Sequence, residues 1–148
     1  MTDHREQLEE FTPYLMNRIA ARYNKGVESA LKDVGISVAQ MRALAALAES
    51  GPCSITDLSI LTVIKQSTLS RTLDTMENAG LILRTAQGSD SRYRQISLTQ
   101  TGRAAYDAAW PSMQNMRDTM LASLSEDERE NFNSLLLRIF YDIRHHDF

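Results

Sequence analysis

The sequence has few of the residues that mark several large classes of protein. Among its 148 residues it has one cysteine, three prolines and three histidines. The single cysteine, Cys53, cannot form an internal disulfide, which fits a reducing compartment. No apolar run approaches the ~20 residues that span a bilayer, and the N-terminus lacks the apolar segment of a secretory signal. We therefore expect a cytoplasmic protein with no membrane partner.

Catalytic motifs are missing as well. The sequence contains no G-x-S-x-G, no phosphate-binding glycine loop and no H-E-x-x-H, and its histidines lie near the chain ends, far in sequence from Cys53. His145 and His146 are adjacent, and adjacent residues on a helix do not face one target, so a metal site would need further ligands. A frayed C-terminus is the simpler interpretation. We expect no enzyme, no catalytic residue, no metal and no cofactor.

Charge is distributed unevenly along a chain of otherwise ordinary composition. Hydrophobic residues make up 43% and charged residues 24%, as in soluble single domains, and the net charge is −3. That balance argues against a protein that coats nucleic acid indiscriminately. Between residues 62 and 104, however, six basic residues accompany three acidic ones, so the rest of the chain carries −6. The positive segment is where phosphates would dock.

Capping signals predict three helices in the first part of the chain. Thr12, as a cap, and Pro13 predict the start of a helix over about residues 13–32, which carries an apolar stripe and ends at Gly35. Gly26 weakens this helix by ~1 kcal/mol. The stripe is Phe11, Leu15, Ile19, Tyr23, Val27 and Leu31. Two further helices open at the capping residues Ser37 and Ser54.

The inward faces of these two helices follow from their spacing. In the second helix the apolar positions are Met41, Leu44, Leu47 and Ala48. In the third, short helix we expect Leu58 and Leu61 to face the core.

A polar-faced helix and a hairpin come next. Residues 66–78 place Leu69, Leu73 and Met76 on one face and short polar side chains on the other, and Gly80 ends the helix. Residues 81–85 and 93–98 then form two strands around a turn-rich loop at 87–91. The order of helix, short helix, polar-faced helix and charged hairpin predicts a winged helix-turn-helix, because the major groove, ~12 Å wide, admits one α-helix.

The candidate DNA-binding residues lie on the polar-faced helix and on the hairpin. They are Gln66, Ser67, Thr68, Ser70, Arg71, Arg92 and Arg94. On the hairpin, Arg92 and Arg94 could reach phosphates or the minor groove, and Asp90 could hold Arg92 extended. Arg94 could instead pair with Asp90 or a neighbouring strand, and Lys65 is either a phosphate contact or a solvated lysine. A solvated helix face is the structural alternative for the helix residues.

Two helices complete the chain. Thr99 can cap a long helix whose apolar positions extend from Tyr106 to Leu124, and Pro111 should kink it. Ser125 opens the last helix in another capping box, Ser125-Glu126-Asp127-Glu128. Its apolar positions are Phe132, Leu135, Leu136, Ile139, Phe140 and Ile143. The apolar stripe from Tyr106 to Leu124 could line a ligand cavity, but a dimer contact is the simpler interpretation.

Several of these segments resemble the MarR family. They are Gln66-Ser67-Thr68-Leu69-Ser70-Arg71, Met76-Glu77-Asn78-Ala79-Gly80-Leu81, Asp90-Ser91-Arg92 and Leu98-Thr99-Gln100-Thr101-Gly102. The resemblance implies a mainly α fold with a small β-hairpin wing (α+β), a winged helix-turn-helix with dimerisation helices at both ends. It implies one domain over residues 1–148, a DNA-binding lobe at 36–98, and dimerisation helices at 11–35 and 99–148. Two features depart from the common pattern: Met41 stands where tryptophan is frequent, and the turn at residues 62–65 lacks glycine.

The resemblance also implies a function. It suggests a homodimeric repressor that binds a palindromic operator on double-stranded DNA and is released by a small aromatic carboxylate or phenolic effector. Tyr14, Arg18 and Arg22 form an i, i+4, i+8 row that could hold such an effector, although a solvated or dimer-facing flank is the simpler interpretation. The alternative function is a winged helix that binds only protein. Some relatives switch by thiol oxidation near the first helix, whereas Cys53 lies elsewhere and suits a buried structural role.

Overall fold

Helices make up most of the structure, and a small antiparallel sheet lies at one end. The computed structural model describes residues 4–88 and 90–143, with the backbone alone for residues 4–6, 87 and 90–93. The elements in chain order are α1 (His4–Glu9), α2 (Thr12–Leu31), the 3₁₀ helix η1 (Lys32–Val34), α3 (Val38–Ser50), β1 (Cys53–Ser54), α4 (Ile55–Thr62), α5 (Gln66–Asn78), β2 (Ile82–Gln87), β3 (Asp90–Leu98), α6 (Gln100–Met120) and α7 (Glu126–Ile143).

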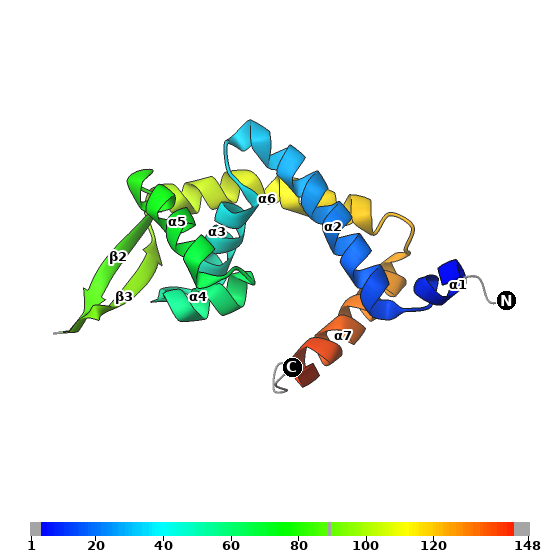
Figure 1. The fold of residues 1–148 in the computed structure, drawn as a ribbon. Coiled ribbons are helices and arrows are strands. Elements are labelled where there is room, and N and C mark those ends of the chain that lie inside the picture. Colours follow the sequence, from blue (N-terminus) through cyan, green and yellow to red (C-terminus); the bar gives the residue numbers. More distant parts are fainter. Residues whose placement is uncertain (1–3, 89, 144–148) are drawn as a thin grey trace.

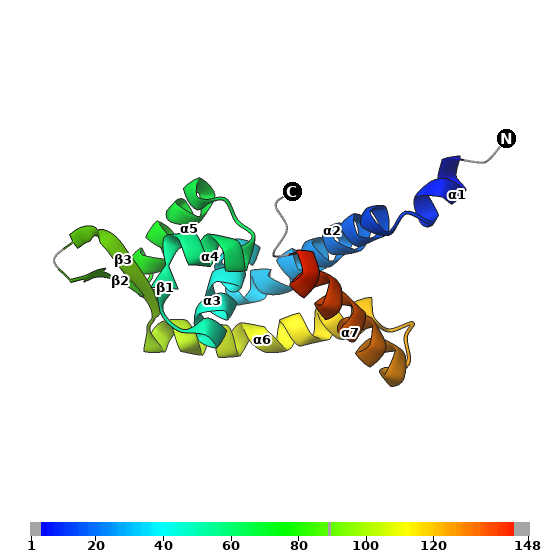
Figure 2. The same ribbon diagram turned by 90° about the horizontal axis from the view of Figure 1, so that it is seen from below.

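The elements divide between two ends of an elongated molecule. Helices α3, α4 and α5 lie together with the β2–β3 hairpin at one end, and α1 and α7 lie at the other (Figure 1). Helices α2 and α6 pack against each other and join the two ends. Seen from below, the hairpin extends outward beyond α5 (Figure 2). The predicted mainly α fold with a small winged helix-turn-helix is confirmed.

Side-chain caps fix most of the predicted helix starts. Ser37 begins α3 in a full capping box: its Oγ accepts from Gln40 N at 3.1 Å, while Gln40 Oε1 accepts from Ser37 N at 2.9 Å. Ser54, Thr99 and Ser125 accept in the same way from the backbone N–H three residues later. The predicted Thr12 cap is wrong. Phe11 is the N-cap of α2 without a side-chain bond, because Thr12 is already helical and Pro13 lies in the first turn.

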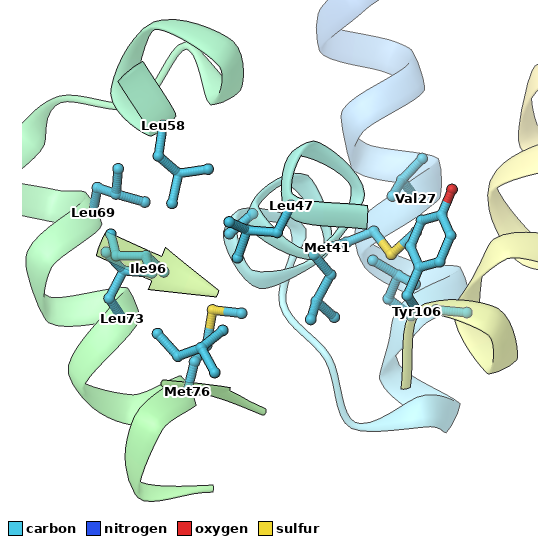
Figure 3. Close-up of a cluster of buried hydrophobic side chains, with 14 residues drawn as sticks. Val27, Met41, Leu47, Leu58, Leu69, Leu73, Met76, Ile96 and Tyr106 are labelled. Carbon is cyan, nitrogen blue, oxygen red and sulfur yellow. The ribbon is translucent and has the colours of Figure 1, made fainter. Parts of the chain in front are cut away.

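The core runs from α3, α4 and α5 into α2 and α6. Leu58 of α4 and Leu69, Leu73 and Met76 of α5 meet Ile96 of β3, and α3 connects this group to Val27 and Tyr106 (Figure 3). Full burial of each such side chain stabilises the fold by roughly 1.5–3 kcal/mol. Helices α4 and α5 and strand β3 therefore share one continuous hydrophobic core with α2 and α6.

One predicted core residue, Leu61, is not buried. Its side chain is 50% exposed, whereas the next residue, Thr62, is 3% exposed. The threonine hydroxyl donates to the carbonyl oxygen of Leu58 at 2.7 Å, so its polar group is satisfied within the helix. The inward face of α4 is thus Leu58 and Thr62, one turn apart.

The sheet has one strand more than the sequence predicted, in the order β1-β3-β2. Strand β1 pairs antiparallel with β3 through Cys53 opposite Ile96 and Ser54 opposite Gln95. The hairpin strands are also longer than expected, since pairing continues to Gln87 and Asp90. The predicted loop at 87–91 is therefore mostly strand, with Gly88 in the left-handed region.

Gly26 lies where α2 packs against α6. A Cβ atom at this position would overlap the terminal methyl of Met116, which is the far end of a flexible side chain. The glycine weakens α2 as an isolated helix, and the space beside it is filled by Met116. Helix α6 continues through Pro111 without interruption, and Tyr106 and Trp110 stack within it at 5.4 Å between ring centroids.

Candidate nucleic-acid interface

Helix α5 presents a polar face because its apolar face is fully buried. Leu69, Leu73 and Met76 are inaccessible to solvent, as predicted, so the opposite side of the helix faces outward. Ser67 and Arg71 are exposed and one turn apart, which puts a hydroxyl and a guanidinium side by side at the centre of that face. These groups have the size and donor chemistry to read base edges in a major groove.

The other three predicted residues of α5 lie beside this pair. Gln66 is tied to α4, since its Nε2 donates to Thr56 Oγ1 at 3.2 Å. Thr68 lies on the side of α5 that faces α2 and α3, where it lines a groove. Ser70 is half-buried and its carbonyl oxygen accepts from Arg84. The structure thus leaves Ser67 and Arg71 as the most outward pair.

The hairpin adds one described cation to this surface. Arg94 is exposed on β3, opposite Ala86 of β2. Strands β2 and β3 and helix α5 occupy the same end of the molecule (Figure 1). The side chains of Arg92 and Asp90 lie outside the described residues, so their contact stays a prediction.

Arg84 has a role that the sequence did not reveal. It belongs to the positive segment, yet its side chain pairs with Asp74 and Glu77 of α5. It is therefore engaged inside the protein rather than offered to phosphates. The pattern that could have found it is the strand alternation, because Arg84 follows the buried Ile82 at a spacing of two and must share its face.

The base of the hairpin is anchored by the segment Leu98-Thr99-Gln100-Thr101-Gly102. Thr99 N donates to the carbonyl oxygen of Leu81 at 3.1 Å, and Thr99 Oγ1 donates to that of Gly80 at 2.6 Å. The same Oγ1 accepts from Gly102 N at 2.9 Å. A Cβ at Gly102 would overlap the carbonyl oxygen of Leu81. The start of α6 thus packs against the end of α5 through the hydroxyl of Thr99 and the missing side chain of Gly102.

The turn before α5 has an unusual backbone. Val63 has φ +56° and ψ +41°, in the left-handed region that favours glycine, and its side chain is 85% exposed. Lys65 occupies the N-cap position of α5 without a capping hydrogen bond and is exposed. The glycine-free turn noted in the sequence is thus accommodated by a strained valine.

The predicted effector residues lie on the outer half of α2. Arg18 Nη1 donates to Tyr14 Oη at 2.8 Å, and the guanidinium lies 5.7 Å from the centre of the Tyr14 ring. Arg22 is exposed one turn further on. None of the three lines the groove of about 600 Å³ between α2, α3 and α5. Its lining is Ala21, Asn24, Lys25, Glu28, Val38, Ala39, Arg42, Ile64 and Thr68.

Comparisons with known proteins decide the family. The MarR family model matches residues 36–93. A transcriptional regulator of the MarR family from Silicibacter pomeroyi has a solved structure with 40% identity and a TM-score of 0.83, covering 95% of each chain. This chain belongs to the MarR family. The match includes α3, α4, α5, β2 and the first part of β3, up to residue 93.

Two further relatives have informative names. The HTH-type transcriptional repressor IacR of Pseudomonas putida is 25% identical over 135 residues, which cover 91% of this chain and 81% of the relative. A Mycobacterium tuberculosis MarR family protein, solved in complex with salicylic acid, is 25% identical with a TM-score of 0.73, covering 86% of this chain and 94% of that one. The chain is a DNA-binding transcriptional regulator.

The surroundings of Cys53 bear on whether its thiol is reactive. It is half-buried in β1, and burial, followed by the nearby Asp57 carboxylate, raises the pKa of its thiol. A raised pKa lowers the fraction of thiolate, which is the reactive form. Its surroundings therefore favour the structural role expected from the sequence.

Two other features bear on what the MarR chain can bind. Within residues 4–88 and 90–143 no helix has the length and apolarity to cross a membrane. Among the same residues no group of three or more histidine, cysteine, aspartate or glutamate side chains could hold a metal ion.

Proposed function

We propose that the protein is a repressor that binds an inverted-repeat operator as a homodimer. The observation that carries the proposal is the outward pair Ser67 and Arg71 on α5, with the exposed Arg94 on the neighbouring hairpin. Each α5 would enter a major groove, with half-site centres about one helical turn, ~34 Å, apart. Binding there would compete with RNA polymerase.

The contacts divide between base reading and backbone positioning. Arg71 reads a guanine edge or binds a phosphate, and Ser67 and Thr68 supply short donors beside it. Gln66 and Ser70 complete the helix contacts near its N-terminal half. On the hairpin, Arg92 and Arg94 reach phosphates or the minor groove, with Asp90 orienting Arg92.

The homodimer is supported by apolar surface at the end opposite the hairpin. Helix α7 has no buried residue along Glu126–Ile143, although it is rich in large apolar side chains. Exposed apolar patches of this kind mark protein interfaces. The exposed set on α1, α2 and α7, with Phe11 just before α2, is Leu8, Phe11, Leu15, Met16, Ile19, Phe132, Leu135, Leu137, Ile139, Phe140, Tyr141 and Ile143. We assign residues 11–35 and 99–148 to dimerisation and 36–98 to the DNA-binding lobe.

A small aromatic carboxylate or phenol is the proposed effector. The groove between α2, α3 and α5 offers two cations, Lys25 and Arg42, beside apolar Val38 and Ile64, and Thr68 of α5 contributes to its wall. A charge-assisted bond to a carboxylate and an apolar wall for a ring suit this class of ligand. The relative bound to salicylic acid supports the same class. The row of Tyr14, Arg18 and Arg22 is the second candidate site.

The effector can only act through unequal affinity for two forms of the dimer. A ligand that binds equally to the DNA-bound and free arrangements shifts nothing. The groove meets this requirement because it touches both α5, through Thr68, and α2, which joins the two ends. A ligand there would favour a spacing of the two lobes that does not fit the operator.

Selection from a random duplex library at about 0.15 M salt tests the proposal, because nonspecific phosphate attraction is partly screened at that concentration. Enrichment of an inverted repeat with half-sites one helical turn apart is the expected result. Folded, dimeric protein that enriches no sequence would contradict operator recognition and favour the alternative function, a winged helix that binds only protein.

A further inference from the structure

The side chains of β2 alternate between solvent and helix α5. Ile82 is fully buried, Leu83 is 54% exposed, and Arg84 turns back toward α5 with only 15% of its side chain exposed. This alternation follows from the pleat of a strand. A cation at the base of the hairpin is thus directed into the protein at the point where the hairpin meets the DNA-reading helix.

Arg84 bonds to three positions along one stripe of α5. Its Nη1 donates to Asp74 Oδ1 at 2.6 Å and to Glu77 Oε2 at 3.3 Å, and its Nη2 donates to the carbonyl oxygen of Ser70 at 3.2 Å. Ser70, Asp74 and Glu77 are spaced at i, i+4 and i+7 and therefore share a side of the helix. The planar guanidinium bridges all three at once, which an ammonium group cannot do in the same geometry.

A fourth bond fixes the strand backbone. Arg84 N donates to Glu77 Oε1 at 3.2 Å, so Glu77 holds both the main chain and the side chain of Arg84. The hairpin is therefore attached to α5 through charge-assisted bonds as well as through the apolar contact of Ile82. Rotation of the hairpin about its base would break these bonds together.

Charge gives the contact a second effect. Asp74 is exposed on α5 one turn after Ser70, close to the outward face that bears Arg71. An unpaired carboxylate at this place would repel DNA phosphates. Arg84 offsets part of the negative charge of Asp74 and Glu77 from within the protein. It does so without occupying the DNA-facing surface itself.

We propose that Arg84 is a positioning residue for DNA recognition, which fixes the hairpin relative to α5 and offsets part of the negative charge of two carboxylates beside the DNA. The inference rests on the proposed operator binding. Both elements must fit adjacent grooves simultaneously, so a fixed angle between them lowers the ordering cost of binding. Arg84 then contributes to specific affinity without contacting a phosphate.

The central test compares wild type with Arg84→Met and with the triple variant Asp74→Asn, Glu77→Gln, Arg84→Met. The triple variant removes the attachment and also the unpaired carboxylates. We expect both variants to lose at least tenfold in the ratio of operator affinity to affinity for scrambled duplex, and Arg84→Lys to recover part of the loss. In the triple variant the slope of log K against log salt should equal that of wild type, because no phosphate contact is lost.

Two results would overturn the inference. If the slope of log K against log salt became smaller in magnitude by about 0.9 in the triple variant, Arg84 would be a phosphate contact. An unchanged affinity ratio in both variants would remove its positioning role. Arg94→Ala is the matched control. Because Arg94 is proposed to contact a phosphate directly, this variant should show a less steep dependence of log K on log salt.

Hydrogen exchange of the free protein separates this inference from the proposed function. Arg84→Met should speed exchange of the β2 and β3 amides near the base of the hairpin, while amides of α3 stay protected and report an intact fold. Faster exchange in a protein that selects no operator would refute only the proposed function. Unchanged exchange would refute the inference, whatever DNA the wild type binds.

Discussion

Arg71 is the residue from which we expect the largest single effect on DNA binding. It lies one turn from Ser67 on the outward face of α5. If it reads a guanine, Arg71→Ala should weaken operator binding by ~1–3 kcal/mol and relax specificity at one base pair, whereas a phosphate contact would weaken all sequences alike. Titration of the selected operator and a scrambled duplex distinguishes the two roles. Arg103→Ala on α6, an exposed arginine paired with Asp107, is the control. Unchanged binding would remove Arg71 from the interface.

Val63 should be a source of strain that glycine relieves. Its left-handed backbone costs about 1–2 kcal/mol for a residue other than glycine. Glycine avoids this cost, but it lowers the free energy of unfolding by roughly 0.5–1 kcal/mol because it gives the unfolded chain more conformational entropy. Val63→Gly should therefore raise the free energy of unfolding by up to about 1 kcal/mol, measured by urea denaturation. Val34→Gly in η1 lacks this backbone strain and should destabilise. A less stable Val63→Gly protein would show that the exposed valine makes a compensating contact.

Single residues were predictable where one local rule decides their surroundings. Periodicity correctly placed Leu69, Leu73 and Met76 in the core. It failed at Leu61, because Thr62 satisfies its hydroxyl on the carbonyl of Leu58 and takes the inward position instead. Strand alternation could have placed Arg84 on the face of Ile82, but it could not have named its partners, which lie seven and ten residues away on another element.

At the scale of elements, the junction between α5, the hairpin and α6 depends on Gly102. A Cβ there would meet the backbone carbonyl of Leu81, which cannot move without shifting the end of α5. We expect Gly102→Ala to destabilise by about 1–3 kcal/mol, the usual cost of overpacking, and to weaken operator binding. Gly26→Ala is the matched control, because its Cβ would meet only the flexible end of Met116. Equal urea midpoints for the two variants would contradict this account.

The elements were predictable from caps and periodicity, and the exceptions have physical causes. Ser37, Ser54, Thr99 and Ser125 each supply a local signal that the structure confirms. Strand β1 has only two residues and exists through pairing with Gln95 and Ile96, some forty residues later in the chain. No local pattern contains that information.

At the scale of the molecule, the exposed apolar face of α7 should form the dimer. Ile139 is exposed near the centre of this face, whereas Ser50 is exposed at the end of α3, in the part assigned to DNA binding. Ile139→Glu should shift the protein to monomer in sedimentation experiments and weaken operator binding, because the two half-sites are then bound independently. Ser50→Glu adds the same charge away from this face and should stay dimeric. A dimeric Ile139→Glu protein would place the interface elsewhere.

The elongated shape of the molecule explains why the sequence could not decide where the effector binds. Apolar periodicity marked a stripe along α2, but it could not tell which part faces α3 and α6 within one chain and which part awaits a partner. The structure divides it: Val27 and Leu31 are buried, whereas Phe11, Leu15 and Ile19 are exposed. The groove lies near the buried half, and the Tyr14 row lies along the exposed half.

Salicylate can distinguish these two sites. If the groove is the effector site, Arg42→Ala should weaken salicylate binding measured by calorimetry and keep the protein on its operator at higher salicylate concentration, because the carboxylate loses one of its two cations. Arg18→Ala should retain both responses, and the reverse pattern would assign the effector to the Tyr14 row. Linkage adds a quantitative requirement: saturating operator DNA must weaken salicylate affinity by the same factor by which salicylate weakens operator affinity. Equal salicylate affinity with and without DNA would mean that bound salicylate cannot release the repressor, whichever site it occupies.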